Sequence, residues 1–94
     1  MVELEWLESA REDLLAIVEY IADDNPDAAQ RLKDDIESRV ARLPERPRLY
    51  RAGRVDGTRE MVVHANYVVV YAFDDTRVRI LRVLHAAQLW PTRG

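Results

Sequence analysis

The residues of this sequence best suited to chemistry are arginines. Residues 39–94 contain eleven arginines and no lysine, and an arginine keeps its charge when partly buried and forks onto carboxylate or phosphate groups. Arg51 and Arg54 lie on an irregular segment, where they are placed to meet an acidic partner or are simply solvated. Arg77 and Arg79 share one face of a predicted strand with Leu81, so at least one of them lies near the boundary between the core and the surface, where it can meet a partner. The arginine bias indicates a protein interface or an anion site.

Other chemically capable residue types are scarce. The sequence has two histidines and no cysteine, which excludes a disulfide framework, a thiolate metal site and a cysteine nucleophile. His64 alternates with apolar residues and is interpreted as structural. His85 follows the last predicted strand, where one interpretation is that it closes the strand end by hydrogen bonding to the chain. We expect neither a metal nor a cofactor.

Charge is divided between the two halves of the chain. Residues 1–38 hold twelve acidic and three basic residues, a net charge of −9, whereas residues 39–94 hold eleven arginines and five acidic residues, a net charge of +6. This asymmetry is explained equally well by a surface that meets an acidic partner and by acidic helices packed on a basic sheet.

Length and composition favour one folded domain spanning residues 1–94. Of the 94 residues, 48% are apolar and 33% are charged, which is typical of a folded globule rather than a disordered chain. The first twelve residues carry four glutamates and one arginine, the opposite of a basic signal-peptide start. No apolar run approaches the roughly 20 residues of a membrane span. We expect a cytoplasmic protein with no membrane contact.

The first half of the chain is predicted to form a strand and two helices. Apolar and acidic residues alternate over residues 2–6, the period of a half-buried strand. Ser9 and Glu12 match a capping box, and apolar residues at helical spacing carry the first helix to Asp23. Asn25-Pro26 begins a second helix that Pro44 ends. The joint between the helices is so short that they must form an antiparallel hairpin.

The second half is predicted to supply the sheet that the hairpin covers. An irregular crossing over residues 44–57 leads to three strands over 59–64, 67–73 and 77–84, whose short connections indicate an antiparallel meander. The strand at 67–73 has no polar alternation and is therefore predicted to be central. Residues 85–90 are a candidate cover for its second face. The fold class is α+β: an N-terminal strand, a two-helix hairpin on a small antiparallel sheet, and a short C-terminal segment.

Short motifs follow one another in a fixed order along these elements. None is diagnostic alone, but their order over residues 6–91 is specific and resembles the RelE/ParE superfamily of bacterial toxins. The resemblance implies a growth-arresting toxin of a type II toxin-antitoxin system, neutralised by a cognate antitoxin in a hetero-oligomer. The motifs are Trp6-Leu7-Glu8-Ser9-Ala10, Asp13-Leu14, Tyr20-Ile21-Ala22, Asp27-Ala28-Ala29, Arg31-Leu32, Leu43-Pro44-Glu45-Arg46-Pro47, Arg54-Val55-Asp56-Gly57-Thr58-Arg59-Glu60, Asn66-Tyr67, Tyr71 and Val83-Leu84-His85-Ala86.

The superfamily resembled here has two activities. RelE-like members are ribosome-dependent mRNA endonucleases, whereas ParE-like members share the fold without a nuclease site and act on DNA gyrase. A protein that docks on the ribosome and its mRNA needs a broadly basic surface, but this chain has a pI near 5.3 and a single lysine. We therefore expect ParE-like action on DNA gyrase, without catalytic activity of the chain's own. A RelE-like mRNA endonuclease is the alternative, and a non-toxic α+β adaptor is a third hypothesis.

The resemblance also assigns roles to residues. A RelE-like nuclease would use Arg59 as phosphate clamp, Glu60 as base and His85 as general acid; the alternative is that Arg59 and Glu60 serve in a cross-strand ion pair. Ala86 follows His85 where some of the nucleases have a tyrosine. Trp90 either plugs the sheet or contacts a partner. The predicted target- or antitoxin-binding residues are Arg51, Arg54, Arg59, Arg77, Arg79 and Trp90.

Overall fold

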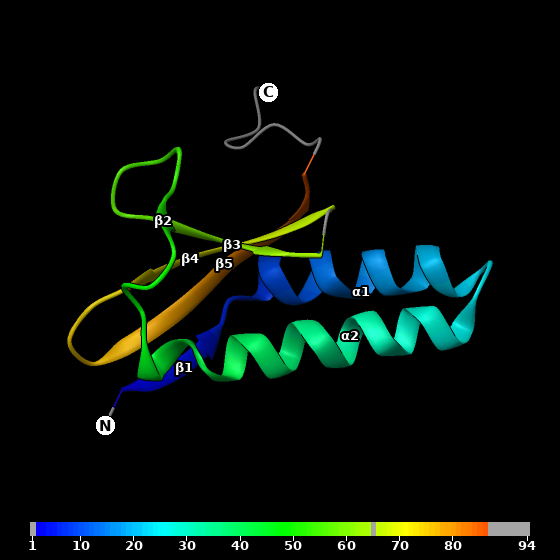
Figure 1. The fold of residues 1–94 in the computed structure, drawn as a ribbon, viewed down its shortest axis with the longest axis horizontal. Helices are drawn as coiled ribbons and strands as arrows, with labels where there is room; N and C mark the ends of the chain where they lie inside the picture. The colour runs from blue at the N-terminus through cyan, green and yellow to red at the C-terminus, as the bar shows by residue number, and fades with distance from the viewer. Residues whose placement is uncertain (1, 65, 87–94) are drawn as a thin grey trace.

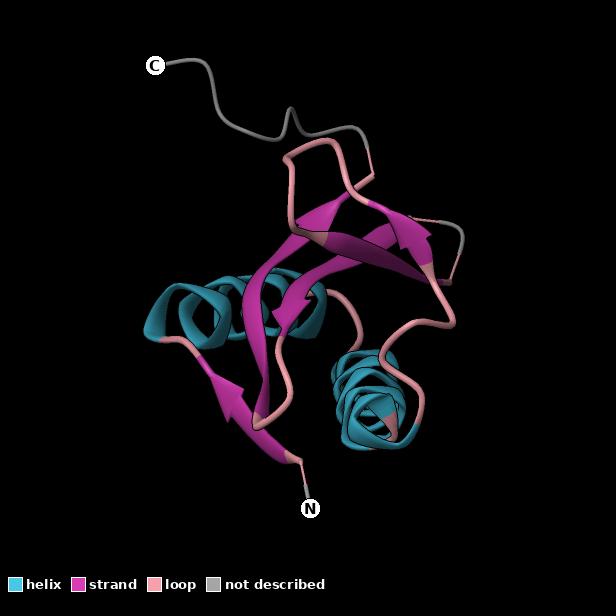
Figure 2. Cartoon of the chain, turned by 90° about the vertical axis from the view of Figure 1, so that its left-hand side faces the viewer, coloured by secondary structure: helices cyan, strands magenta, loops and turns pink. Residues whose placement is uncertain are grey.

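The computed structural model describes residues 2–64 and 66–86 and shows two helices packed on one face of a twisted sheet (Figure 1). The α+β class expected from the sequence is confirmed. Figure 2 shows how strongly the strands twist across the sheet. The elements in chain order are β1 (Glu3–Trp6), α1 (Glu8–Ala22), α2 (Pro26–Ala41), the 3-10 turn η1 (Leu43–Glu45), β2 (Arg51–Ala52), β3 (Arg59–Val63), β4 (Tyr67–Phe73) and β5 (Arg77–His85).

The first helix, α1, begins one residue earlier than its apolar stripe suggested. Its N-cap residue is Leu7, which gives no side-chain cap, so the capping-box interpretation of Ser9 is wrong. The Ser9 hydroxyl instead donates to the carbonyl oxygen of Leu81 at 2.8 Å, and the Leu7 N–H donates to the carbonyl oxygen of Ile80. The start of the helix is therefore fixed by the sheet rather than by a local cap.

The second helix, α2, follows the local rules closely. The Asn25 side chain accepts a hydrogen bond from the Ala28 N–H at 3.1 Å, and Pro26 occupies the first helical position, as predicted. The helix ends at Ala41, three residues before Pro44, which lies instead in the 3-10 turn η1. The two helices run antiparallel (Figure 1).

The sheet contains five strands in the order β1-β5-β4-β3-β2. β4 is central, as its continuous apolar sequence predicted. β3, β4 and β5 form the expected antiparallel meander, whereas β1 pairs with β5 in parallel, so the complete sheet is mixed. β2 was not predicted, because a two-residue strand is too short to show a period.

A β-bulge at Val70 and Tyr71 shifts the register between β4 and β5. It leaves β5 one residue longer than its partner, with Leu81 as the extra residue. A bulge bends the strand that carries it. Here β5 pairs with β1 only as far as Ile80, and beyond that point α1 lies along its open edge.

Asp13 of α1 closes this open edge of β5. Its carboxylate accepts hydrogen bonds from Arg82 Nε at 2.6 Å, from Arg82 Nη2 at 3.0 Å and from the Val83 N–H at 3.0 Å. The hydrogen bond to Asp13 raises the pKa of Arg82 above its ordinary value. A forked, charge-assisted pair of this kind fixes both distance and orientation, so α1 is held to the sheet at one defined position.

The main core lies between the helices and the sheet. Within the described residues, its fully buried members come from both helices, from η1 and from three strands: Ala10, Ile36, Val40, Leu43, Met61, Val63, Val69, Tyr71, Val78, Ile80 and Val83. A second, smaller cluster of Val68, Val70 and Leu84 occupies the opposite face of the sheet. The proposed cover of that face, residues 85–90, lies mostly outside the described residues. In the ranges 2–64 and 66–86, no helix has the length and hydropathy needed to cross a membrane.

The central strand provides a test of this core. Val69 is fully buried in β4, whereas Val62 on the neighbouring strand is 45% exposed. We predict that Val69→Asp destabilises the fold by about 4 kcal/mol or more, because it buries an unpaired carboxylate. Urea unfolding followed by circular dichroism measures the effect. Val62→Asp is the matched control and is expected to fold; equal stability of the two variants would contradict this core.

Candidate functional site

The carboxylate of Glu60 lies at the centre of the β2–β3 connection. Glu60 is only 4% exposed, and it faces Arg51 across the two strands. Arg51 Nη2 donates to Glu60 Oε1 at 3.0 Å, and the Arg54 backbone N–H donates to Glu60 Oε2 at 3.1 Å. Glu60 therefore forms its cross-strand ion pair with Arg51, and both of its oxygens are engaged in holding the loop.

The loop over residues 53–58 has a defined shape that exposes Arg54. The Gly53 N–H donates to the Thr58 carbonyl at 2.8 Å, and the Thr58 hydroxyl donates to the Val55 carbonyl at 2.6 Å. A Cβ at Gly53 would collide with the Thr58 side chain, and Gly57 has a φ of 83°, which favours glycine. Arg54 is therefore an exposed cation on a well-supported loop.

Arg59 points away from Glu60, because neighbouring residues of a strand face opposite sides of the sheet. Its Nη1 donates to the Tyr50 carbonyl at 2.6 Å and to the Arg48 carbonyl at 3.3 Å. The guanidinium groups of Arg48 and Arg59 lie 5.3 and 5.6 Å from the centre of the Phe73 ring. Arg59 thus fastens the segment before β2 to the sheet.

The same segment is fastened a second time by Tyr71. The Tyr71 hydroxyl donates to the Pro47 carbonyl at 2.7 Å, and burial raises the pKa of this phenol to about 12. The side chain is fully buried. Tyr71 therefore remains a neutral hydrogen-bond donor at physiological pH, and its role in this structure is to hold the chain at Pro47.

His85 lies at the end of β5. Its ring meets Tyr67 edge to face, with centroids 5.5 Å apart and planes at 84°. Together with Arg54 and Glu60 it borders a depression of only about 10 Å³ over Val68, Val70 and Leu84. Of the three residues predicted for a nuclease, Arg59 and Glu60 thus lie on opposite faces of the sheet, while His85 lies at the end of β5, paired in register with Tyr67.

The remaining predicted contact residues are spread over the sheet edge. Arg77 Nη1 and Arg79 Nε each lie 3.4 Å from Glu5 Oε1 of β1. These exposed ion pairs are weak and easily exchanged for a partner. Trp90 lies outside the described residues. His64, interpreted as structural, pairs with Asp35 of α2 at 2.8 Å. Within residues 2–64 and 66–86, no group of three or more potential metal ligands occurs.

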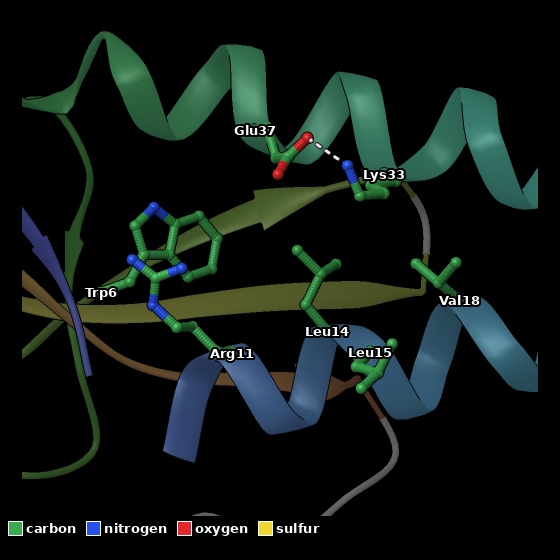
Figure 3. Close-up of a pocket in the computed structure, with 7 residues that line it drawn as sticks. All are labelled: Trp6, Arg11, Leu14, Leu15, Val18, Lys33 and Glu37. Atoms are coloured by element: carbon green, nitrogen blue, oxygen red, sulfur yellow. Dashed lines mark hydrogen bonds and ion pairs between the residues drawn. The ribbon is translucent and has the colours of Figure 1, made fainter. Parts of the chain in front are cut away.

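A groove between α1 and α2 was not predicted from the sequence (Figure 3). Its volume is about 210 Å³. Lys33 and Glu37 of α2 form an ion pair at 2.9 Å on its far side, and the hydrogen bond to Glu37 raises the pKa of Lys33. Leu15 is 58% exposed. An apolar residue outside the buried stripe of α1 was the feature of the sequence that could have indicated this groove. The lining residues are Trp6, Arg11, Leu14, Leu15, Val18, Lys33 and Glu37.

Comparison with known proteins agrees with the fold and with the order of the motifs. Residues 4–90 match the family described as ParE toxin of type II toxin-antitoxin system, parDE. The toxin RelE2 of Caulobacter vibrioides is 42% identical over 93 residues, which cover 95% of this chain and 100% of that toxin.

Solved structures give the same result. A structure of the chromosomal ParDE system from P. aeruginosa has a TM-score of 0.81 at 22% identity and covers 90% of this chain and 96% of its own. The RelBE2 toxin-antitoxin complex of Mycobacterium tuberculosis has a TM-score of 0.59 at 26% identity, with 89% and 96% covered. This chain is therefore the toxin of a type II toxin-antitoxin module, and within the RelE/ParE superfamily it belongs to the ParE toxin family.

Proposed function

We propose that this toxin arrests growth by binding DNA gyrase, without a nuclease activity of its own. The observation that carries the proposal is the separation of Arg59 from Glu60 by the thickness of the sheet. RNA cleavage by a 2′-OH requires a base, an acid and a cation around one phosphate. Arg59 instead donates to the Tyr50 and Arg48 carbonyls, so the predicted phosphate clamp and the predicted base lie on opposite faces of the sheet.

The environment of Glu60 supports the same proposal. A general base needs a lone pair directed at the proton it removes, whereas the two oxygens of Glu60 already accept hydrogen bonds from Arg51 and from the Arg54 N–H. The adjoining depression is about 10 Å³, roughly the space of one water molecule. This face suits contact with a protein better than it suits enclosing a ribose phosphate.

One observation favours the alternative, a RelE-like mRNA endonuclease. Arg54, Glu60 and His85 border the same depression, so Arg54 would supply the cation that Arg59 does not. The two proposals differ in what they require of His85. An enzyme needs its titrating imidazole, and a contact surface needs only its shape and hydrogen bonding.

We propose further that the antitoxin covers the groove between α1 and α2. Apolar side chains line much of this groove, and Leu15 is largely exposed. An apolar hollow with charged residues at its rim is the kind of surface that receives the apolar face of a partner helix. The similar M. tuberculosis structure is a toxin-antitoxin complex, which supports an antitoxin as partner.

We predict that His85→Gln remains toxic. Glutamine keeps the size and hydrogen bonding of the side chain but cannot titrate, so a nuclease would lose about 10²–10⁴-fold in rate, whereas a gyrase-binding toxin would lose little. Induced expression of the variant is expected to trigger a DNA-damage response and to leave a reporter mRNA uncut. Arg54→Gln, which keeps the backbone bond to Glu60, is expected to reduce toxicity.

The opposite pattern would decide for the endonuclease. It consists of codon-specific mRNA cuts by the parent protein and loss of both cutting and toxicity in His85→Gln. Circular dichroism must show that the variant is folded. Plasmid supercoiling, read in the same cultures, reports separately on gyrase.

The groove is tested by a pair of variants on α1. Leu15→Ser is expected to weaken binding of the antitoxin by about tenfold or more, because it removes an apolar contact from the interface. Tyr20→Ser is the matched control, since Tyr20 is 81% exposed on the same helix and does not line the groove. Titration calorimetry measures both affinities, and equal losses would argue against the groove.

A further prediction concerns the rate of antitoxin binding. If arginines of residues 39–94 meet acidic groups of the antitoxin, the association rate should fall steeply between about 50 and about 300 mM salt. Stopped-flow mixing at several salt concentrations measures it. An association rate that does not change with salt would remove the electrostatic contribution.

A further inference from the structure

The largest cluster of arginines around one hollow lies beyond the C-terminal end of α2. A cavity of about 540 Å³ opens where the chain leaves α2 and turns toward β2, the green segment in Figure 1. This volume is in the range of about 300–1,000 Å³ that is usual for ligand pockets. Its lining includes Arg39, Arg42, Arg46, Leu43, Leu49 and Tyr50.

Two of these arginines have no structural task within the described residues. Arg39 pairs with Asp35 one helical turn away, at 3.2 Å, and as a cation in the last turn it complements the helix dipole. Arg42 and Arg46 are exposed and, in the part of the chain that the structure describes, form no ion pair or side-chain hydrogen bond. Their guanidinium groups remain available for a ligand that carries carboxylate or phosphate oxygens.

The rim of this cavity is held in place from the sheet. Tyr71 donates to the Pro47 carbonyl, and Arg59 donates to the Arg48 and Tyr50 carbonyls. A rim whose backbone is already fixed loses little conformational entropy when a ligand binds. Tyr71 and Arg59, which hold the rim, therefore act as positioning residues for the cavity.

An apolar contact accompanies the charges. Leu49, which is 61% exposed, and the buried side chain of Leu43 both line the cavity. Large apolar side chains this exposed mark contacts with protein more often than with phosphate. Glu45 also lines the cavity, so a ligand there meets one negative charge beside the three arginines.

We propose that this cavity binds an acidic peptide segment, with the carboxylates on Arg42 and Arg46 and one apolar side chain against Leu49. Arginine clusters recognise acidic motifs through forked hydrogen bonds. The net charge of −3 opposes a long nucleic acid, whereas a short peptide is influenced mainly by charges within about 8 Å at physiological salt. The site is distinct from the groove of Figure 3 and does not depend on gyrase as the target.

The test is fluorescence anisotropy with a short labelled peptide in which pairs of glutamates flank a leucine. We expect saturable binding that weakens by about tenfold or more when Arg42→Glu and Arg46→Glu are combined. Leu49→Ser is expected to weaken it as well. Arg31→Glu is the matched control, because it reverses the charge of another exposed arginine on α2 and should leave binding unchanged.

Three outcomes would overturn the proposal. They are absence of binding to the parent toxin, equal binding by the double variant and by Arg31→Glu, and tighter binding of a thymidine oligonucleotide than of the peptide. The last would assign the cavity to nucleic acid. Circular dichroism of each variant controls for folding, and because the assay contains neither gyrase nor antitoxin, its result is independent of the proposed function.

Discussion

The forked contact between Asp13 and Arg82 fixes the relation of the helices to the sheet. β5 needs a partner along both edges, yet β1 covers it only to Ile80. Beyond the end of β1, the Asp13 carboxylate accepts hydrogen bonds from the Val83 N–H and from the Arg82 guanidinium. The Ser9 hydroxyl donates to the Leu81 carbonyl on the same strand. A helix thus satisfies a strand edge that would otherwise be exposed. The packing of α1 on the core depends on this position.

The arginines of the second half perform two different tasks. Arg59 and Arg82 hold the structure together through carbonyl and carboxylate oxygens, whereas Arg42, Arg46 and Arg54 are exposed. The composition indicated that arginines are important, but it could not distinguish the structural arginines from the exposed ones. That distinction depends on which backbone carbonyls lie within reach of each side chain in the folded chain. The alternation of side chains along β3 did argue against a nuclease site at Arg59 and Glu60, because two adjacent residues of a strand cannot both face one phosphate.

The pattern of residue types along the sequence predicted those structural features that rest on local preferences or on several residues at once. The apolar stripes of α1 and α2, the Asn25 cap and the central position of β4 could all be predicted, since each rests on local preference or on a run of similar side chains. The hydrogen bond that the Ser9 hydroxyl makes could not be predicted, because its partner, the Leu81 carbonyl, lies 72 residues further along the chain. The groove between the helices was missed for the same reason, because its lining residues on α1 and α2 meet only in the folded chain. The cavity after α2 is lined by residues 39–50 alone, but this irregular segment has no period from which its shape could be predicted.

The parallel pairing of β1 with β5 joins the two ends of the described chain, with Glu3 beside Arg77. Contacts so distant in sequence form late, and folding that depends on them is slow. During synthesis, β1 emerges from the ribosome first and has no partner until β5 has followed it. The sheet can therefore be completed only after β5 has been translated.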